Sequence, residues 1–226
     1  MPGRFFYDNI LWLMDITFLG HASFKLKGKH TGVITDPYDP SIGLKYPRAE
    51  ADIVTVSHDH HDHSAVSQVG GEPFVVGGPG EYEIKGVRIV GVPSFHDEKK
   101  GTIRGKNTIY NIQTDNLFIC HLGDLGQSEL VSEQLEAIGQ VDILLIPVGG
   151  VYTIDAQGAA KIAASLEPKI VIPMHYADPG SNLKLEPVDK FLKEMGAEKV
   201  EPQAKLSITT DKLPEELVVV VLEKIA

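Results

Sequence analysis

Ser57-His58-Asp59-His60-His61-Asp62-His63-Ser64-Ala65-Val66 carries the strongest signal in this 226-residue sequence. Four of the nine histidines of the chain fall within six residues there, interleaved with aspartates. The segment directly follows the apolar run 53–56, which we expect to be a buried strand that ends in a loop. Imidazoles and carboxylates gathered at the exit of a strand indicate a metal site.

The spacing within this cluster indicates how the ions would be held. In an extended segment the side chains alternate between two faces, so His58 and His60 project to the same side and can hold one cation. If the chain turns into a helix near Asp62, that carboxylate and His63 can reach a second cation. These ligand types suit zinc, iron or manganese, and the absence of a nearby cysteine disfavours a closed structural zinc site. A purification tag would lie at a chain end and would lack the aspartates.

Further candidate ligands follow other expected strands. Two cations about 3.5–4 Å apart require roughly three protein ligands each and a shared bridge. We expect Asp124, in a Gly-Asp turn, to bridge the ions and His175 to complete the second site. The full set of expected metal ligands is His58, His60, Asp62, His63, His96, Asp124 and His175.

The pattern resembles the signature of the metallo-β-lactamase-fold hydrolases. The resemblance rests on His58-x-His60-x-Asp62-His63 and on residues 16–24, 34–38, 122–124 and 172–176, which occur in the order of the family. Within that superfamily the sequence is similar to stand-alone zinc-dependent hydrolases related to ascorbate-phosphate lactonases and, more distantly, to ribonuclease Z. The resemblance implies an α/β protein with a four-layer αββα sandwich, in which two mixed β-sheets lie face to face with helices outside. It also implies two similar halves.

The third ligand of the first ion is either His96 or His121, because both follow strands. Coordination by both His121 and Asp124 would be crowded, since only two residues separate them, whereas His96 comes from an independent loop. The ligand order of the family also favours His96. We therefore expect His121 to support the ligands or to donate a proton, and the candidate catalytic residues are Asp62, Asp124 and His121.

Four more residues are candidates for contacts around the ions. His21 follows a strand and is either an ordinary turn histidine or a contact to substrate or ligand. Asp36 ends another strand, where its carboxylate could orient an imidazole. Tyr176 is a candidate proton donor. Arg104 lies in a basic, glycine-containing loop at residues 97–107, which is either a flexible, solvated hairpin tip or a clamp for an anionic substrate.

Length and composition limit the other possibilities. We expect one domain over residues 1–226, with residues 1–13 as an N-terminal extension. A net charge of −10 opposes general affinity for the phosphate backbone, so we do not expect a nucleic-acid partner. The single cysteine, Cys120, excludes an internal disulfide and fits a reducing compartment, so we expect a cytoplasmic location. No apolar run approaches the ~20 residues of a membrane helix.

Hydrophobic patterning predicts many short strands and few helices. The expected helices span residues 64–69, 128–138, 156–166 and 187–195. The expected strands span residues 16–19, 23–26, 33–35, 53–56, 74–76, 82–84, 87–92, 108–112, 117–120, 142–147, 169–173, 206–209 and 217–222.

These features predict a metal-dependent hydrolase with two Zn²⁺ ions, for which Mn²⁺ or Fe²⁺ could substitute. A hydroxide shared by the two ions would attack a small, possibly anionic ester, lactone or phosphorylated metabolite. The sequence has no Gly-x-Ser-x-Gly elbow that would supply a serine nucleophile. The alternatives are a phosphodiesterase or nuclease of the ribonuclease Z type, a di-iron redox protein and a non-catalytic metal-binding module.

Overall fold

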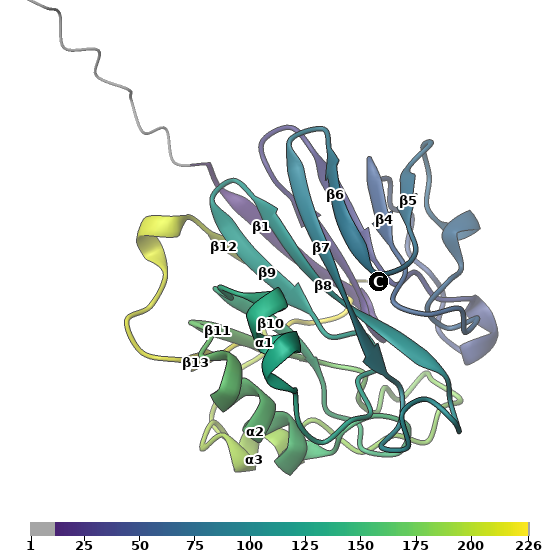
Figure 1. The fold of residues 1–226 in the computed structure, drawn as a ribbon, viewed down its shortest axis with the longest axis vertical. Helices are drawn as coiled ribbons and strands as arrows, with labels where there is room; N and C mark the ends of the chain where they lie inside the picture. The colour runs from purple at the N-terminus through teal and green to yellow at the C-terminus, as the bar shows by residue number, and fades with distance from the viewer. Residues whose placement is uncertain (1–11, 226) are drawn as a thin grey trace, which may run out of the picture.

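Two mixed β-sheets form the centre of the computed structural model, which describes residues 12–225 (Figure 1). Most of the expected N-terminal extension therefore lies outside the described residues. The first sheet has six strands in the order β12 (Leu206–Ile208), β1 (Met14–Gly20), β2 (Ser23–Lys27), β3 (Gly32–Thr35), β4 (Ile53–Thr55) and β5 (Phe74–Val76). The second has seven strands in the order β13 (Val218–Val219), β11 (Ile170–Met174), β10 (Ile143–Pro147), β9 (Leu117–His121), β8 (Lys106–Thr114), β7 (Val87–Phe95) and β6 (Gly80–Ile84).

The two sheets repeat one pattern of strand pairing. Antiparallel pairs join β12, β1, β2 and β3 in the first sheet and β6, β7, β8 and β9 in the second. Parallel pairs then continue through β4 and β5 in the first sheet and through β10, β11 and β13 in the second. This succession agrees with the two similar halves that the resemblance implied.

The principal apolar core lies between the two sheets. Alternate side chains of each strand enter it, including Ile16 and Phe24 from the first sheet and Ile119 and Ile172 from the second. Strands β10 and β11 are buried on both faces, so every one of their residues is buried. Their continuous apolar sequences are those expected of parallel strands covered on both sides.

The outer layers differ on the two sides of the sandwich. Helices α1 (Ser132–Ile138), α2 (Ala156–Leu166) and α3 (Asp189–Glu194) lie together over the seven-stranded sheet (Figure 1). Over the six-stranded sheet, residues 38–49 and two 3₁₀ turns, η1 (Pro40–Ile42) and η2 (Val66–Gln68), form the cover. Within residues 12–225, none of the helices has the length and apolar character needed to cross a membrane.

Three expected helices were too long. The helix expected at residues 64–69 is only the single turn η2, because the Gly70 amide bonds to the carbonyl of Ala49 (2.8 Å) and leads the chain away. Helix α1 begins at Ser132 and not at residue 128, because the Gln134 side chain turns back and accepts the Val131 amide. Helix α3 spans six residues of the nine expected. Strand β7 extends past its expected end, to Phe95.

Tyr110 connects the two sheets through its hydroxyl group. The ring is fully buried, and the hydroxyl donates to the carbonyl of Val56 (2.8 Å) and accepts the amide of Gly78 (2.7 Å). Tyr110→Phe should therefore deprive two partly buried backbone groups of this partner and lower the free energy of unfolding by about 1–3 kcal/mol. Urea denaturation would measure this loss. If residues 1–226 form one domain as expected, the transition should be a single cooperative step.

Tyr82→Phe is the matched control. The Tyr82 hydroxyl also bonds to Gly78, through its carbonyl (3.1 Å), but it is only partly buried. Water can replace that contact, so the control should change the stability by less than about 0.5 kcal/mol. Equal losses in the two variants would contradict the role assigned to Tyr110.

Candidate metal centre

The candidate ligands meet at one end of the sandwich, where strands from both sheets end. His21 follows β1, His58 follows β4 and His96 follows β7. His175 follows β11, and its amide bonds to the carbonyl of His21 (2.8 Å), which joins the two sheets at this point. The topology therefore brings together residues that lie more than 150 positions apart in the sequence.

The first group of ligand atoms comes from His58, His60 and His96. These atoms all lie within 4.8 Å of one another, and Nε2 of His58 is 3.1 Å from Nδ1 of His60. The side chains of His58 and His96 are buried, whereas His60 is exposed. The structure thus groups His96, and not His121, with the histidine pair.

The second group comes from His21, Asp62, His63 and His175, whose ligand atoms also lie within 4.8 Å of one another. Nε2 of His21 is 3.2 Å from Nε2 of His63 and 3.3 Å from Oδ2 of Asp62. We expected His21 outside the ligand set, either as an ordinary turn histidine or as a contact to a ligand or to substrate. The structure instead places its ring nitrogen among the ligand atoms.

The carboxylate of Asp124 lies between the two groups. Its Oδ2 atom is 3.2 Å from Nε2 of His96 and 3.3 Å from Nε2 of His175. Its Oδ1 atom is 3.2 Å from Nε2 of His63. One carboxylate therefore contacts histidines of both groups, which is the arrangement expected of a bridging ligand.

The electrostatics of the cluster fit a bound cation. Burial lowers the pKa of His58 to about 3 and that of His21 to about 4, so both imidazoles are neutral at pH 7. Burial also acts on Asp124, but His175 and His63 outweigh it and hold the pKa of this carboxyl well below its usual range. Oδ1 of Asp124 is buried and has no hydrogen-bond partner. Facing nitrogen lone pairs and a buried carboxylate oxygen are stabilised by positive charge between them.

Asp36 and Ser57 hold two of the histidines from behind. The fully buried Asp36 accepts a hydrogen bond at Oδ2 from Nδ1 of His63 (2.9 Å) and at Oδ1 from the Ser57 amide (2.8 Å). The Ser57 hydroxyl donates to Asp36 and lies 2.9 Å from Nδ1 of His58. One carboxylate thus fixes a histidine of each group, directly for His63 and through Ser57 for His58. This is the geometry of a carboxylate that orients metal-binding imidazoles.

His121, predicted to support the ligands or to donate a proton, lies away from the ligand groups. This residue is still part of β9, where side chains 117, 119 and 121 share the face that points between the sheets. Its Nε2 donates to the carbonyl of Ala22 (2.8 Å), and its Nδ1 accepts the Gly123 amide (3.2 Å). Both ring nitrogens are therefore committed to the backbone, away from the ligand atoms.

Tyr176 and Arg104 also lie outside the ligand groups. The Tyr176 ring packs near Phe18 (6.1 Å between centroids), and burial raises its pKa to about 12. Arg104 lies in the loop after His96, which we described as either a flexible tip or a clamp. The loop is fastened, because the carboxylate of Asp97 accepts four backbone amides within it.

Asn107 is a site residue that the sequence analysis missed. Its side chain is 1% exposed; Nδ2 donates to the carbonyl of Leu122 (2.9 Å), and Oδ1 accepts the Asp124 amide (3.0 Å). Asn107 therefore holds both ends of the turn that presents Asp124. Gly123, between them, has φ +57°, and a side chain there would clash with Asn107 and Ser57. No motif marks Asn107, because its role depends on the pairing of β8 with β9.

Comparison with known proteins identifies relatives of this chain. Residues 15–175 match the family model described as the β-lactamase superfamily domain. A UPF0173 metal-dependent hydrolase from Thermococcus kodakarensis is 30% identical over 194 residues, which cover 73% of this chain and 85% of the relative. A second protein with this description, from Methanoculleus marisnigri, is 31% identical over 190 residues and covers 72% of this chain and 81% of its own length.

Solved structures share the fold. A Thermotoga maritima protein assigned to the Zn-dependent hydrolases of the metallo-β-lactamase superfamily has a TM-score of 0.77 at 40% sequence identity. The match covers 92% of this chain and 98% of that protein. Igni18, a metallo hydrolase from Ignicoccus hospitalis, has a TM-score of 0.64 at 23% identity, covers 87% of this chain and 98% of its own, and shows likeness of fold.

His96→Ala and His121→Ala should have opposite effects. Loss of His96 removes a member of the first ligand group, so the purified, zinc-loaded variant should hold fewer ions per chain than the unchanged protein. Loss of His121 leaves two backbone groups unpaired. The His121→Ala variant should therefore retain its metal content while its free energy of unfolding falls by about 1–3 kcal/mol. Elemental analysis and urea denaturation would measure the two effects. An unchanged ion count in His96→Ala would contradict the grouping.

Asn107→Ala should weaken zinc binding by about 10–100-fold, because the turn that carries Asp124 loses both of its side-chain hydrogen bonds. Asn111→Ala is the matched control. Asn111 lies on the same strand and its side chain donates two hydrogen bonds, but to the carbonyls of Ile138 and Gln140. Competition with a chelating dye would give both affinities. Similar losses of zinc affinity in the two variants would show that the effect is general destabilisation.

Proposed function

The chain belongs to the β-lactamase superfamily as a metal-dependent hydrolase, and from this premise we propose that it uses two zinc ions to hydrolyse a small ester, lactone or phosphorylated metabolite. The observation that supports two ions is that Asp124 contacts two groups of ligand atoms that have no residue in common. His58, His60 and His96 would hold the first ion. Asp62, His63 and His175 would hold the second, with His21 as a further nitrogen donor. Nitrogen and oxygen donors without cysteine suit catalytic zinc, although manganese and iron accept the same donors.

When bound, zinc acts as a Lewis acid and lowers the pKa of water from 15.7 to about 7, which supplies a nucleophile near neutral pH. The protein's own contribution is to orient its ligands and to keep its carboxylates charged. Burial raises the pKa of Asp62, but the hydrogen bond from His21 and the charge of His63 outweigh burial and lower it. Asp62 is therefore ionised at neutral pH, so its carboxylate can serve as an anionic ligand or accept a hydrogen bond at Oδ2.

The charges around the site support a small, anionic substrate. Arg104 lines a pocket together with His58 and His60, and guanidinium groups recognise carboxylate and phosphate. The net charge of −10 opposes general affinity for nucleic acid, so the phosphodiesterase or nuclease alternative has less support. A non-catalytic metal-binding module would retain zinc without hydrolysing any substrate.

The proposal predicts about two zinc ions per chain and hydrolysis of at least one small ester or lactone by the zinc-loaded protein. The screen would include lactones, carboxylic esters, thioesters, phosphate monoesters, phosphodiesters and β-lactams, with metal content measured in parallel. His60→Ala should lower kcat/KM by about 100-fold or more, because it removes an ion ligand and not only a supporting contact.

His61→Ala is the control for His60→Ala. His61 lies in the same segment and is exposed, but its ring is in neither ligand group. Its loss should leave kcat/KM within about twofold, as expected for an exposed residue away from the ligands. Hydrolysis that survives His60→Ala unchanged would refute the metal-based mechanism. Zinc binding without turnover across the whole panel would favour the non-catalytic module.

A further inference from the structure

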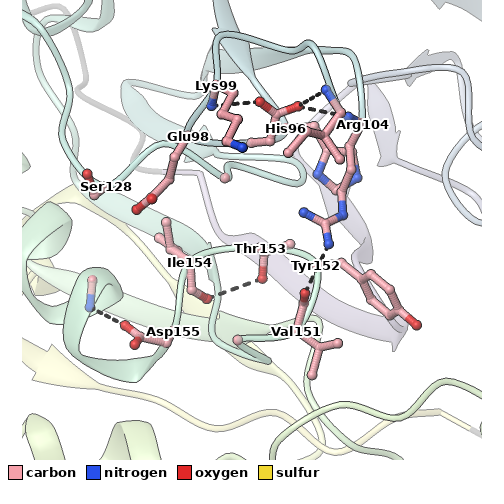
Figure 2. Close-up of a pocket in the computed structure, with 15 residues that line it drawn as sticks. His96, Glu98, Lys99, Arg104, Ser128, Val151, Tyr152, Thr153, Ile154 and Asp155 are labelled. Carbon is pink, nitrogen blue, oxygen red and sulfur yellow. Dashed lines mark hydrogen bonds between the residues drawn. The ribbon is translucent and has the colours of Figure 1, made fainter.

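A second pocket, of about 370 Å³, opens beside His96 between two loops, residues 97–104 and residues 150–155 (Figure 2). Another pocket, of about 410 Å³, is lined by His58 and His60. Arg104 lines both pockets. A ligand whose reacting group lies at the histidines can therefore extend past Arg104 into the pocket beside His96.

Both walls of this pocket are held in place by hydrogen bonds. The carboxylate of Asp97 is buried and accepts the amides of Lys99, Gly101, Ile103 and Arg104 at 2.8–3.0 Å. On the opposite wall, the Ile154 amide bonds to the carbonyl of Leu125 (2.9 Å). Asp155 caps α2 by accepting the Gly158 amide (2.8 Å). Such a preformed pocket spares a ligand the entropic cost of ordering loops.

The rim of the pocket exposes large apolar side chains. Ile103 is 60% exposed, Val151 45% and Tyr152 38%, and all three line this one pocket. Clusters of exposed apolar side chains beside a reactive site mark ligand-binding surfaces. Covering this surface with an apolar group of a ligand would stabilise the complex by about 25 cal/mol per Å² of apolar area removed from water.

The Arg104 guanidinium crosses the opening and is available to an anion. Figure 2 shows it reaching down from the upper loop towards the carbonyl of Val151 (3.5 Å). It lies 5.7 Å from the centroid of the Tyr152 ring. Among residues 12–225 it forms no ion pair, so most of its five N–H donors are unused. The other charged groups lining the pocket are Glu98 and Lys99, which are opposite in sign, and two aspartates. The carboxylate of Asp97 is occupied by four backbone amides, and that of Asp155 caps α2.

We propose that this pocket binds the part of the substrate that lies beyond the scissile bond, and that the substrate is an amphiphilic anion. Its carboxylate or phosphate binds Arg104, and its apolar chain or ring packs against Ile103, Val151 and Tyr152. This inference rests on the proposed hydrolase function, because that function places the scissile bond at the histidines. It makes Arg104, Ile103 and Tyr152 specificity-determining residues.

Titration calorimetry of the zinc-loaded protein tests the pocket without requiring turnover. The probes are 4-phenylbutyrate, butyrate, 4-phenylbutanol and 4-phenylbutyl phosphate. Phenylbutyrate should bind about tenfold more tightly than butyrate, because only its ring reaches the apolar rim. It should also bind about tenfold more tightly than phenylbutanol, because only the acid engages Arg104. Butyrate carries the same carboxylate, so any direct contact with zinc is common to both acids. The phosphate probe then shows which anion Arg104 prefers.

Two pairs of variants separate the contribution of the anion contact from that of the apolar contact. Arg104→Gln should remove the preference for the anion over the alcohol, whereas Lys100→Gln, a cation of the same loop that lines neither pocket, should keep it. Ile103→Ser should reduce the preference for phenylbutyrate over butyrate. Val131→Ser, at an exposed apolar residue outside the pocket, should not.

Equal affinity for phenylbutyrate and butyrate would overturn the apolar site. If Arg104→Gln and Lys100→Gln have the same preference for phenylbutyrate over phenylbutanol, Arg104 does not bind the anion as proposed. Hydrolysis of the substrate panel is measured separately, so failure of the proposed function is distinguishable. If nothing is hydrolysed while both binding preferences are observed, the pocket binds amphiphilic anions as proposed, and the hydrolase proposal fails. If hydrolysis proceeds without either preference, the pocket proposal fails alone.

Discussion

The structure around the candidate site depends on one buried charge, the carboxylate of Asp124. Burying an ionised carboxylate costs several kcal/mol unless positive charge or hydrogen-bond donors surround it. Here the surroundings are imidazole nitrogens from His63, His96 and His175, supplied by three separate loops. A cation shared with those nitrogens would satisfy the carboxylate and the imidazole lone pairs together. The strand ends must therefore meet at this point, because the carboxylate of Asp124 would otherwise be buried without the groups that stabilise its charge.

Three residues at the site have strained backbone conformations, which add to the free-energy cost of bringing the strand ends together. Asp36, His21 and His175 all have positive φ angles, of 37°, 56° and 52°, although none is a glycine. Such conformations cost of order 1–3 kcal/mol each and persist only where surrounding packing determines them. The apolar core between the sheets supplies that packing, and it reaches the site through fully buried Ala22 and Met174. The stability of the sandwich thus maintains the strained turns that aim the ligands.

Different parts of the molecule carry the candidate ion ligands and the proposed substrate contacts. The ligands are fixed from behind by Asp36 and Asn107, which are buried and fully hydrogen-bonded. The backbone of the loop of residues 97–104 is held by Asp97, whereas the side chain of Ile103 is exposed and that of Arg104 is partly exposed. Substitutions in this loop can change what is bound without disturbing the ligand groups. This separation suits a fold whose matched structures, at 11–40% identity to this chain, share the sandwich but differ widely in sequence.

The sequence alone determined the local part of this site and its family. Alternation along an extended segment predicted that His58 and His60 share one face, and the motifs around residues 16–24 and 172–176 predicted the sandwich. Tertiary structure decided the rest, because it sets which strand ends coincide. His121 follows the same apolar alternation as Leu117 and Ile119, so it points between the sheets, whereas the histidines that end β1 and β7 reach the ligand groups. The roles of His21 and Asn107 depend on pairing between strands distant in sequence, and no local pattern records that pairing.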